Sequence, residues 1–476
     1  MAQVTFNKTY NSGYDGLFNV LPQGTNYWMV MNAHQNPDQS LVCKLDSLGN
    51  VILSKSFADT SNSTIIYSLL KDYDSNFISG CYKSNIVTNQ SNAFLFKFDV
   101  NGDSLWSKTF TDSTGQDLNG NYITLTSDSG YLITGQLWDP VMSVGDYFIL
   151  KADGVGNFLW SQSFGGNGNE IGYSSIETPD KGFLSIGITR SFGFSNTSNR
   201  DELLVKWDSL GNYQWHKTFG TINDEYAICI SKLADGNYML GSIKYNSSTN
   251  IQNGKLIKID LNGNIIWQQL YASKSSFWWL QEQMNSDIVI VGSSRQSNNV
   301  DDGLIIRTDS AGNQKWRRHY RFGIDHCYFR DVKETPDGGI ICAGFVFDGA
   351  SGNQDGWLVK LDSTGCLGSG NCGEPTGLFE TATSTLYDIT VSPNPVTEQA
   401  IVKIEGLPQH LLDENYKFSI YSIKGKLVAT PRTGFLITDT GIQFIFKRES
   451  LNQGIYLLDI EAYSGEKIGV VKVVVQ

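Results

Sequence analysis

Few residues of this 476-residue chain combine types and spacing that suit catalysis. The five histidines are scattered over different segments: His34, His216, His319, His326 and His410. Only Asp325-His326 places a histidine beside another ionisable residue in a predicted loop, where such a pair could act as general acid and base. No nucleophile or oxyanion donor stands at a defined spacing from this pair. We therefore predict a protein that is not an enzyme and uses no cofactor or metal ion, and we keep Asp325 and His326 as binding candidates.

Aromatic residues in predicted loops are stronger candidates for ligand binding. Trp138, Phe192, Phe194 and Tyr245 stand among Gly, Ser and Asn residues. Exposed rings with amide neighbours suit sugars or peptides, because they combine stacking with hydrogen bonds. Packing of the loops onto the scaffold is the alternative. The run 277–279, Phe-Trp-Trp, begins a strand and is expected in the core.

Arginines gather late in the chain, at Arg317, Arg318, Arg321 and Arg330. Three arginines from different repeats could hold a carboxylate, as a sialidase requires. These four stand close together in one part of the sequence instead. We expect them on a solvated strand and its neighbouring loop.

The seven cysteines fall into two groups. Most stand within apolar runs and are expected to be buried thiols: Cys43, Cys81, Cys229 and Cys342. Cys366 and Cys372 flank a flexible Leu-Gly-Ser-Gly-Asn segment, and we predict a disulfide between them if the chain is exported. No second Cys or His pair stands nearby at zinc-ligand spacing, which argues against a zinc site.

Composition narrows the class of protein. The net charge of −12 argues against nucleic acid and anionic membranes as partners. The hydrophobic content of 40% supports a folded core, and 48 Gly, 22 Tyr, 25 Phe and 11 Trp favour an all-β fold.

The element that must position these residues is a repeat, Lys-x-Asp-x-x-Gly-Asn-x-x-Trp, seen in full at 206–215. Its Asp suits the first position of a type I turn and its Gly the fourth, so the motif joins two strands. The aspartate recurs at spacings of 49–55 residues: Asp46, Asp99, Asp153, Asp208, Asp260, Asp309 and Asp362. An apolar anchor follows seven residues later in six copies: Leu53, Trp106, Trp160, Trp215, Trp267 and Trp316.

The missing seventh anchor predicts how the repeats close. None follows Asp362, but residues 6–10, Phe-Asn-Lys-Thr-Tyr, match the strand at 106–110. A ring closes well when one unit mixes both termini, since ladder hydrogen bonds then hold the join. We predict a seven-bladed β-propeller over residues 4–365, whose last blade takes its outermost strand from residues 4–10.

A second marker, Thr178-x-Asp180-x-Gly182, predicts the turn between the first two strands of each blade. Antiparallel geometry places both kinds of tight turn on one face of the ring. The variable loops and the crossings between blades then lie on the opposite face, where function is expected.

Together the two markers resemble the propeller repeats of exported proteins of Bacteroidetes-type bacteria. The resemblance covers residues 4–365 and implies a fold without an activity. Quinoprotein propellers have a similar turn and Trp, but their adjacent Cys-Cys pair is absent here.

Residues 366–385 are rich in Gly, Ser and Thr and predict a linker. The repeats stop at 386, and the tail 386–476 resembles the C-terminal sorting domain of the type IX secretion system, type A. The matching residues are Pro393, Asn394, Pro395, Lys424, Gly425, Lys426, Gly454, Tyr456 and Lys472. The resemblance implies a small β-sandwich recognised by the outer-membrane translocon and its shuttle. An ordinary accessory β-sandwich is the alternative.

We therefore expect a secreted or cell-surface protein whose signal peptide was removed before Met1-Ala2. Its propeller is predicted to be a non-enzymatic adhesin or a module that binds glycan or protein. The alternative is a glycan-active hydrolase or lyase on the long-loop face. Convergent carboxylates or arginines in the central funnel would favour the enzyme, whereas Ser, Asn and aromatic residues would favour binding.

Overall fold

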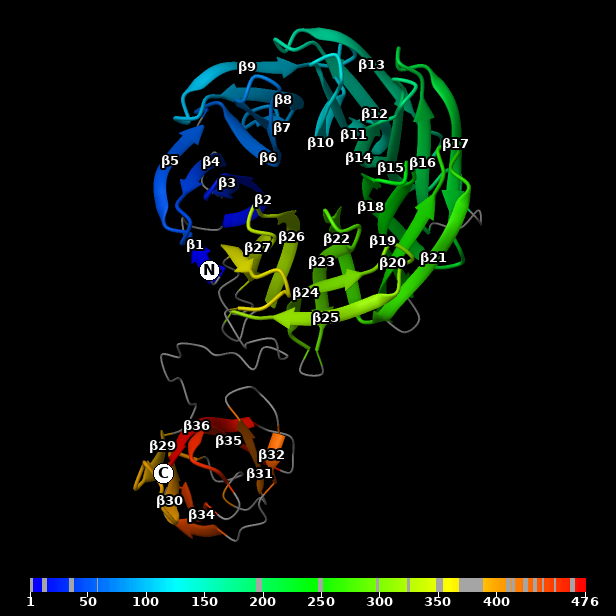
Figure 1. Cartoon of the computed structure of the whole chain (residues 1–476). Helices are drawn as coiled ribbons and strands as arrows, with labels where there is room; N and C mark the ends of the chain where they lie inside the picture. The colour runs from blue at the N-terminus through cyan, green and yellow to red at the C-terminus, as the bar shows by residue number, and fades with distance from the viewer. Residues whose placement is uncertain are drawn as a thin grey trace. The chain divides into compact units, whose positions relative to one another are not determined.

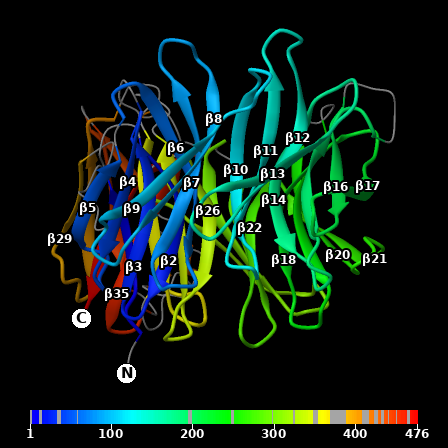
Figure 2. The same ribbon diagram turned by 90° about the horizontal axis from the view of Figure 1, so that it is seen from above.

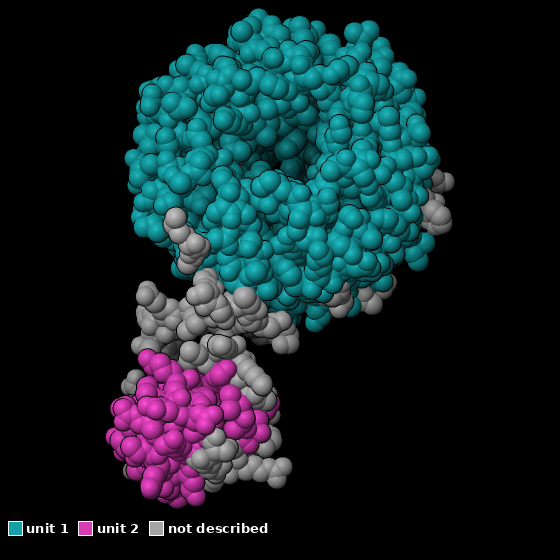
Figure 3. All heavy atoms as spheres, in the orientation of Figure 1, with its two compact units in different colours: residues 1–368 teal, residues 369–476 magenta. Residues whose placement is uncertain are grey.

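The computed structural model describes residues 3–476 except for several short segments and one long one. The segments not described are 11–14, 34–37, 58, 194–198, 247–250, 297–298, 323–325, 348–353, 368–387, 408–411, 413–415, 423–426, 431–434, 439–440, 449–450 and 463–466. The chain forms two compact units, Met1–Gly368 and Ser369–Gln476, which are coloured separately in Figure 3. No helix in the described part is long and apolar enough to cross a membrane.

The first unit is a seven-bladed β-propeller, in which each blade is a four-stranded antiparallel sheet (Figure 1). Blades 1 and 2 are β2 (Asp15–Gln23), β3 (Asn26–Ala33), β4 (Gln39–Leu45), β5 (Val51–Phe57), then β6 (Asn62–Lys71), β7 (Phe77–Asn85), β8 (Ser91–Phe98), β9 (Ser104–Phe110). Blades 3 and 4 are β10 (Asp117–Leu125), β11 (Tyr131–Asp139), β12 (Val144–Ala152), β13 (Phe158–Phe164), then β14 (Glu170–Glu177), β15 (Phe183–Thr189), β16 (Asp201–Trp207), β17 (Tyr213–Phe219). Blades 5 and 6 are β18 (Asp224–Lys232), β19 (Tyr238–Asn246), β20 (Ile251–Ile259), β21 (Ile265–Ser273), then β22 (Ser275–Glu282), β23 (Ile288–Arg295), β24 (Asp301–Thr308), β25 (Gln314–Tyr320).

Blade 7 confirms the predicted closure of the ring. It is built from β26 (His326–Glu334), β27 (Ile340–Phe347), β28 (Gln354–Leu361) and, as its outermost strand, β1 (Phe6–Tyr10). Strand β1 pairs antiparallel with β28 from Phe6↔Lys360 to Tyr10↔Gly356. The indole Nε1 of Trp357 donates a hydrogen bond of 2.6 Å to Oδ1 of Asn7. Both ends of the propeller sequence therefore lie in one sheet.

The strands of the propeller run between its two faces, as the edge-on view of Figure 2 shows. We call the face with the tight turns of the two repeated motifs the turn face. The loop face carries the loops between second and third strands and the crossings from blade to blade. Each blade begins at the axis with its first strand and ends at the rim with its fourth.

The two repeated motifs contact each other within a blade. The basic residue of Lys-x-Asp, on the third strand, pairs with an aspartate in the turn between the first two strands. The pairs are Lys97–Asp74, Lys151–Asp128, Lys206–Asp180, Lys258–Asp235, Arg307–Asp287 and Lys360–Asp337, at 2.6–3.1 Å. The basic side chains are only 1–13% exposed. Loss of the aspartate would leave a buried basic side chain without its partner, so each pair fixes its turn against the strand.

A second contact joins each blade to the next. The repeat glycine Gly211 lies against the Trp160 ring of the preceding blade, and a Cβ there would come within 2.5 Å of it. The same contact recurs around the whole ring, as Gly49 on Phe6, Gly102 on Leu53, Gly156 on Trp106, Gly263 on Trp215, Gly312 on Trp267 and Gly365 on Trp316. All seven glycines have positive φ. The repeat therefore requires glycine for its turn and for the close approach of the neighbouring anchor.

The apolar core lies between the faces of neighbouring sheets. Ile78 and Leu95 of blade 2, for example, are wholly buried in one cluster with Ile123 and Ile133 of blade 3. Such contacts recur from blade to blade and hold the ring through burial of apolar surface.

Every innermost strand contains a β-bulge at the same place. The pairing with the second strand skips one residue per blade: Phe18, Tyr67, Asn121, Tyr173, Ile228, Trp278 and Arg330. We call these seven positions the bulge ring. A bulge bends the strand and redirects a side chain, and here it does so beside the axis of the propeller.

The second unit is a small β-sandwich. One sheet has the order β29 (Asp388–Ser392), β30 (Gln399–Glu405), β34 (Gly441–Lys447), β33 (Phe435–Thr438). The other has the order β32 (Leu427–Ala429), β31 (Tyr416–Ser422), β35 (Gly454–Ala462), β36 (Lys467–Val475). The two sheets share one buried cluster that includes Val402, Phe418, Phe444 and Leu458.

Two glycine variants separate turn geometry from the contact between blades. Gly211 and Gly236 have nearly equal φ values of +81° and +85°, but a Cβ at Gly236 would meet nothing within 4 Å. Gly236→Ala should cost about 1 kcal/mol from positive φ alone. Gly211→Ala should cost about 1–3 kcal/mol more, because its methyl group displaces Trp160. Urea unfolding measures both values, and equal losses of stability would contradict the proposed role of the interblade contact.

Candidate ligand-binding channel

Four side chains of the bulge ring, those of Tyr67, Tyr173, Trp278 and Arg330, lie towards the axis of the propeller. The guanidinium of Arg330, on blade 7, interacts electrostatically with Tyr67 on blade 2 and Tyr173 on blade 4. Neither of these blades is adjacent to blade 7, so the side chains can meet only at the centre. Arg330 Cζ also lies 3.5 Å from the ring centroid of Trp278 on blade 6. Figure 3 shows a hollow at the centre of the ring.

A pair of aromatic rings spans this hollow next to the bulge ring. Tyr122 of blade 3 and Trp279 of blade 6 have ring centroids 5.1 Å apart. Each follows its bulge residue by one position, towards the turn face. Burial raises the pKa of the Tyr122 phenol, and the carboxylate of Asp331 acts in the same direction. We call the part of the hollow on the loop-face side of these rings the channel, with Tyr122 and Trp279 as its floor.

Arg330 is a cation without a carboxylate partner among the described residues. Its side chain retains some exposure, but its Nε is buried and makes no hydrogen bond. Nε1 of Trp278 is also buried without an acceptor. Burial lowers the pKa of Arg330 to about 10, which leaves the guanidinium charged at neutral pH. The channel wall therefore carries a charge and two unused N–H donors side by side.

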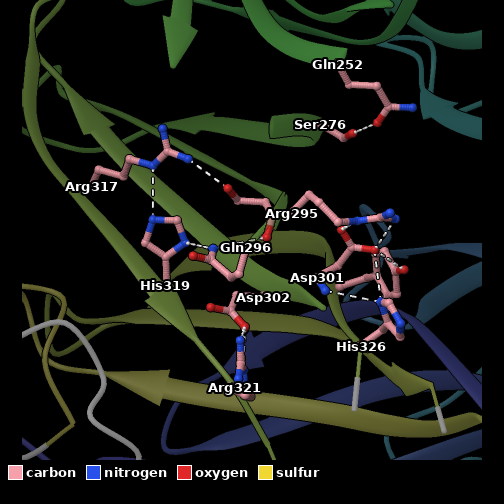
Figure 4. Close-up of polar contacts among 12 residues, drawn as sticks. Gln252, Ser276, Arg295, Gln296, Asp301, Asp302, Arg317, His319, Arg321 and His326 are labelled. Carbon is pink, nitrogen blue, oxygen red and sulfur yellow. Dashed lines mark hydrogen bonds and ion pairs between the residues drawn. The ribbon is translucent and has the colours of Figure 1, made fainter. Parts of the chain in front are cut away.

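A network centred on Asp301 lies at the loop-face end of blades 6 and 7 (Figure 4). Arg295 donates to both carboxylate oxygens, from Nε at 2.7 Å and from Nη2 at 2.9 Å. The Tyr328 hydroxyl donates to Oδ2 at 2.7 Å, and His326 Nδ1 lies 3.0 Å from the same oxygen. Burial opposes ionisation of Asp301, but the hydrogen bonds of Arg295, Tyr328 and His326 outweigh it, so its pKa lies below its ordinary value. Burial, with this hydrogen bond, raises the pKa of Tyr328.

A second network fixes His319 beside the first (Figure 4). Nδ1 lies 3.0 Å from Nε2 of Gln296, and Arg317 Nε donates to Nε2 at 3.1 Å. Burial lowers the pKa of His319 to about 4, and the charges of Arg317 and Arg321 contribute to this. The imidazole is therefore neutral at physiological pH, and both its nitrogens already have partners.

The predicted binding residues come from four blades. Trp138 lies near the end of β11 on blade 3, and Tyr245 lies on β19 of blade 5. The Phe192 ring packs against Phe164 and His216, at centroid distances of 4.9 and 5.0 Å. The ring nevertheless stays partly exposed. His326 joins the Asp301 network, while Phe194 and Asp325 lie outside the described residues. Binding through these six residues remains a prediction.

The prediction that the four arginines lie together on a solvated strand and its neighbouring loop is wrong. Arg317 and Arg318 lie on the outermost strand of blade 6, and Arg321 follows it. Arg330 belongs instead to the innermost strand of blade 7, with a buried Nε. Likewise Trp278, expected in the core, exposes part of its surface and stacks with Arg330.

The sequence does contain a signal for the bulge ring. Each bulge residue stands five positions before the first residue of the second motif, as Tyr173 does before Thr178.

The described cysteines agree with the prediction of buried thiols in the strands. Five are free and buried: Cys43, Cys81, Cys229, Cys327 and Cys342. Cys366 is buried and forms a disulfide. Its predicted partner Cys372 lies outside the described residues, so the pairing itself stays a prediction. No group of three or more His, Cys, Asp or Glu in the described part could hold a metal ion.

In the second unit, the Pro393-Asn394-Pro395 motif is tied to the last strand. Asn394 Nδ2 donates to the Lys472 carbonyl at 2.9 Å, and its Oδ1 accepts from the Val474 amide at 2.8 Å. Gly454 begins β35, where the Tyr456 hydroxyl donates to the carbonyl of Asn452 at 2.9 Å. The predicted basic tip, Lys424, Gly425 and Lys426, lies outside the described residues.

This unit matches a known family. Residues 390–476 match the sequence model of the secretion system C-terminal sorting domain. The C-terminal unit is a sorting domain of the type IX secretion system. The protein is therefore exported by that system to the cell surface or to the medium, and the sorting domain interacts with the secretion machinery. The propeller lies outside the matched residues.

Solved structures similar to the chain share only its fold. The β-propeller domain of the trilobed protease from Pyrococcus furiosus has 11% identity and a TM-score of 0.43, covering 71% of this chain and 96% of that one. The polysaccharide lyase Uly1 has 10% identity and a TM-score of 0.45, covering 73% and 90%. Puromycin hydrolase has 10% identity and a TM-score of 0.47, covering 84% and 60%. No curated protein sequence matches the chain.

Replacing Asp301 tests whether its network is fixed and ionic. Asp301→Asn should lower the free energy of unfolding by about 1–3 kcal/mol near pH 7, because the charged acceptor of Arg295 is lost. The lowered pKa of Asp301 makes this contribution present above its unfolded pKa and lost as pH falls through the folded value. The difference from wild type should therefore shrink towards about pH 3.

Asp103→Asn is the control for this measurement, since Asp103 is 63% exposed in its pair with Lys55 and should contribute little. Urea unfolding at both pH values compares the two variants. An Asp301→Asn effect that is absent, or equal at both pH values, would contradict an ionic network.

Proposed function

We propose that the propeller is a non-enzymatic binding module, of the adhesin type, which the sorting domain delivers to the cell surface. Its ligand is a glycan that enters the channel from the loop face. The observation that carries this proposal is the bulge ring, which directs Tyr67, Tyr173 and Trp278 towards the axis. Aromatic faces with nearby hydroxyl and N–H groups suit a sugar, because its C–H faces stack while its hydroxyls form hydrogen bonds.

The ionisable groups of the two loop-face networks favour binding over catalysis. Asp301 accepts hydrogen bonds from Arg295 and Tyr328, and its lowered pKa makes it a weak base. His319 is held neutral with both nitrogens engaged. A hydrolase or lyase needs an acid and a base with pKa values near the working pH. The contact between Asp301 and His326 is the feature that keeps a glycan-active enzyme as the second candidate.

Delivery and binding are assigned to different units. The outer-membrane translocon and its shuttle are the proposed partners of the sorting domain. The repeated turns of the propeller are occupied by their own Lys–Asp pairs and glycine contacts. The channel and the loops around it are the parts of the propeller whose residues differ between blades, as expected of a binding surface on a repeat scaffold.

A glycan array with the purified full chain tests the proposal. Wild type should bind a defined set of glycans, and Tyr173→Ala should weaken that binding by about five- to thirtyfold through loss of a stacking face. Tyr73→Ala is the control, because Tyr73 is a 57% exposed tyrosine in a turn-face loop. Its binding should equal that of wild type.

The same glycans, incubated in solution and analysed by mass spectrometry, separate the two candidates. Unchanged glycan masses support a binding module. Time-dependent cleavage products that disappear in Asp301→Asn would overturn it in favour of the enzyme. An array without any binding would remove the glycan from the proposal.

A further inference from the structure

The channel contains two buried N–H donors that have no hydrogen-bond acceptor in the described part of the protein. They are Arg330 Nε and Trp278 Nε1, and they come from neighbouring blades whose side chains stack at 3.5 Å. Buried N–H groups in native proteins are almost always satisfied, and an unsatisfied one costs free energy. Two such donors in one contact, at the wall of a channel, indicate a missing acceptor.

The charge of Arg330 indicates that the acceptor is an anion. The adjacent carboxylate of Asp331 is already engaged, since it accepts from the Val20 amide at 3.1 Å and pairs with Lys333. Arg330 is left with aromatic neighbours, Trp278 and, at 5.4 Å, Phe345. Cation–π contact partly offsets the lost hydration but does not neutralise the charge. A partly desolvated cation with a structural role is normally paired, so the unpaired guanidinium of Arg330 suits an incoming carboxylate.

The shape and charge of the surroundings select the kind of anion. Tyr122 and Trp279 span the axis on the turn-face side and close the channel there. A chain-like ligand that enters from the loop face can therefore contact Arg330 only with its leading end. The protein has a net charge of −12, which opposes the approach of a polyanion. Tyr67 and Tyr173 interact electrostatically with Arg330 and are only partly buried, and aromatic rings of this kind can stack on a sugar ring. A saccharide with one terminal carboxylate meets all three conditions: it contacts Arg330 with one end, it is not a polyanion, and it carries a sugar ring for stacking.

We propose that Arg330 and Trp278 form an anion subsite that binds the carboxylate of a terminal uronic acid at the end of an acidic saccharide. This inference rests on the proposed function of the channel and specifies its ligand class. A guanidinium presents two N–H groups in the plane of a carboxylate, and the indole N–H provides a further donor. The interaction is reversible binding and involves no covalent step.

NMR spectroscopy of the full chain reads both donors directly. Glucuronate should shift the Arg330 Nε–H and Trp278 Nε1–H signals saturably, whereas neutral methyl glucoside should not. Acetate should shift them more weakly because it lacks the sugar ring. The signals are assigned with Arg330→Met and Trp278→Phe.

Arg330→Met should weaken glucuronate binding at least tenfold, which corresponds to about 1.4 kcal/mol. Its melting temperature should stay close to that of wild type, because loss of the cation–π contact is offset by removal of a partly desolvated, unpaired charge. Arg190→Met removes an exposed arginine of the loop face and should leave both properties unchanged. A lower melting temperature with unchanged glucuronate affinity would show that Arg330 is structural.

Other results separate this inference from the proposed function. Glycans that bind on the array, with no response of the two N–H signals to glucuronate, would overturn the anion subsite alone. A dipeptide with a free C-terminal carboxylate, N-acetyl-glycyl-glycine, that binds more tightly than glucuronate would overturn the saccharide assignment. Binding of glucuronate through Arg330, with no glycan bound on the array, would overturn the proposed glycan module but keep the subsite.

Discussion

The contact on which the structure depends is that of one turn glycine with the anchor side chain of the preceding blade. At every one of the seven positions a Cβ would lie within 3.1 Å of that anchor. A side chain in the turn would therefore displace the anchor and disturb the packing between two blades. The contact that closes the ring is that of Gly49 with Phe6 of the N-terminal strand. The ring is therefore closed by the same kind of interaction that joins each pair of neighbouring blades.

This constraint acts on the outer strands and the turn face of each blade, and it leaves the residues of the innermost strand free to vary. The outer strands and the turn face are fixed by glycine contacts and by buried Lys–Asp pairs, which explains why their residues repeat. The innermost strands share a backbone feature, the bulge, but not a residue type. The seven bulge positions carry aromatic, aliphatic, amide and guanidinium side chains on one constant frame. A single arginine among them can thus set the charge of the channel without any change in the scaffold.

The fold could be predicted from the sequence because its main determinants are local and periodic. A turn with Asp and Gly, followed at fixed spacing by a Trp, is readable in each copy, and the unmatched strand at 6–10 indicated the closure. The site was harder to predict, because a bulge shifts the register by one residue without changing the apolar pattern around it. The sequence pattern therefore places Arg330 on a solvated strand or its neighbouring loop, and Trp278 in the core. The contact of Phe192 with Phe164 could not be predicted either, since the sequence of a loop does not show which neighbour its aromatic residues meet.

A crystal structure of the propeller with a saccharide that ends in glucuronate tests the central claim most directly, because it shows where a ligand lies on the ring. We predict density in the channel, with carboxylate oxygens within hydrogen-bond distance of the Arg330 guanidinium and Trp278 Nε1, and with the sugar ring against the tyrosines of the bulge ring. Density for the saccharide on the outer loops around Trp138 or Tyr245, with the channel free of it, would contradict the account.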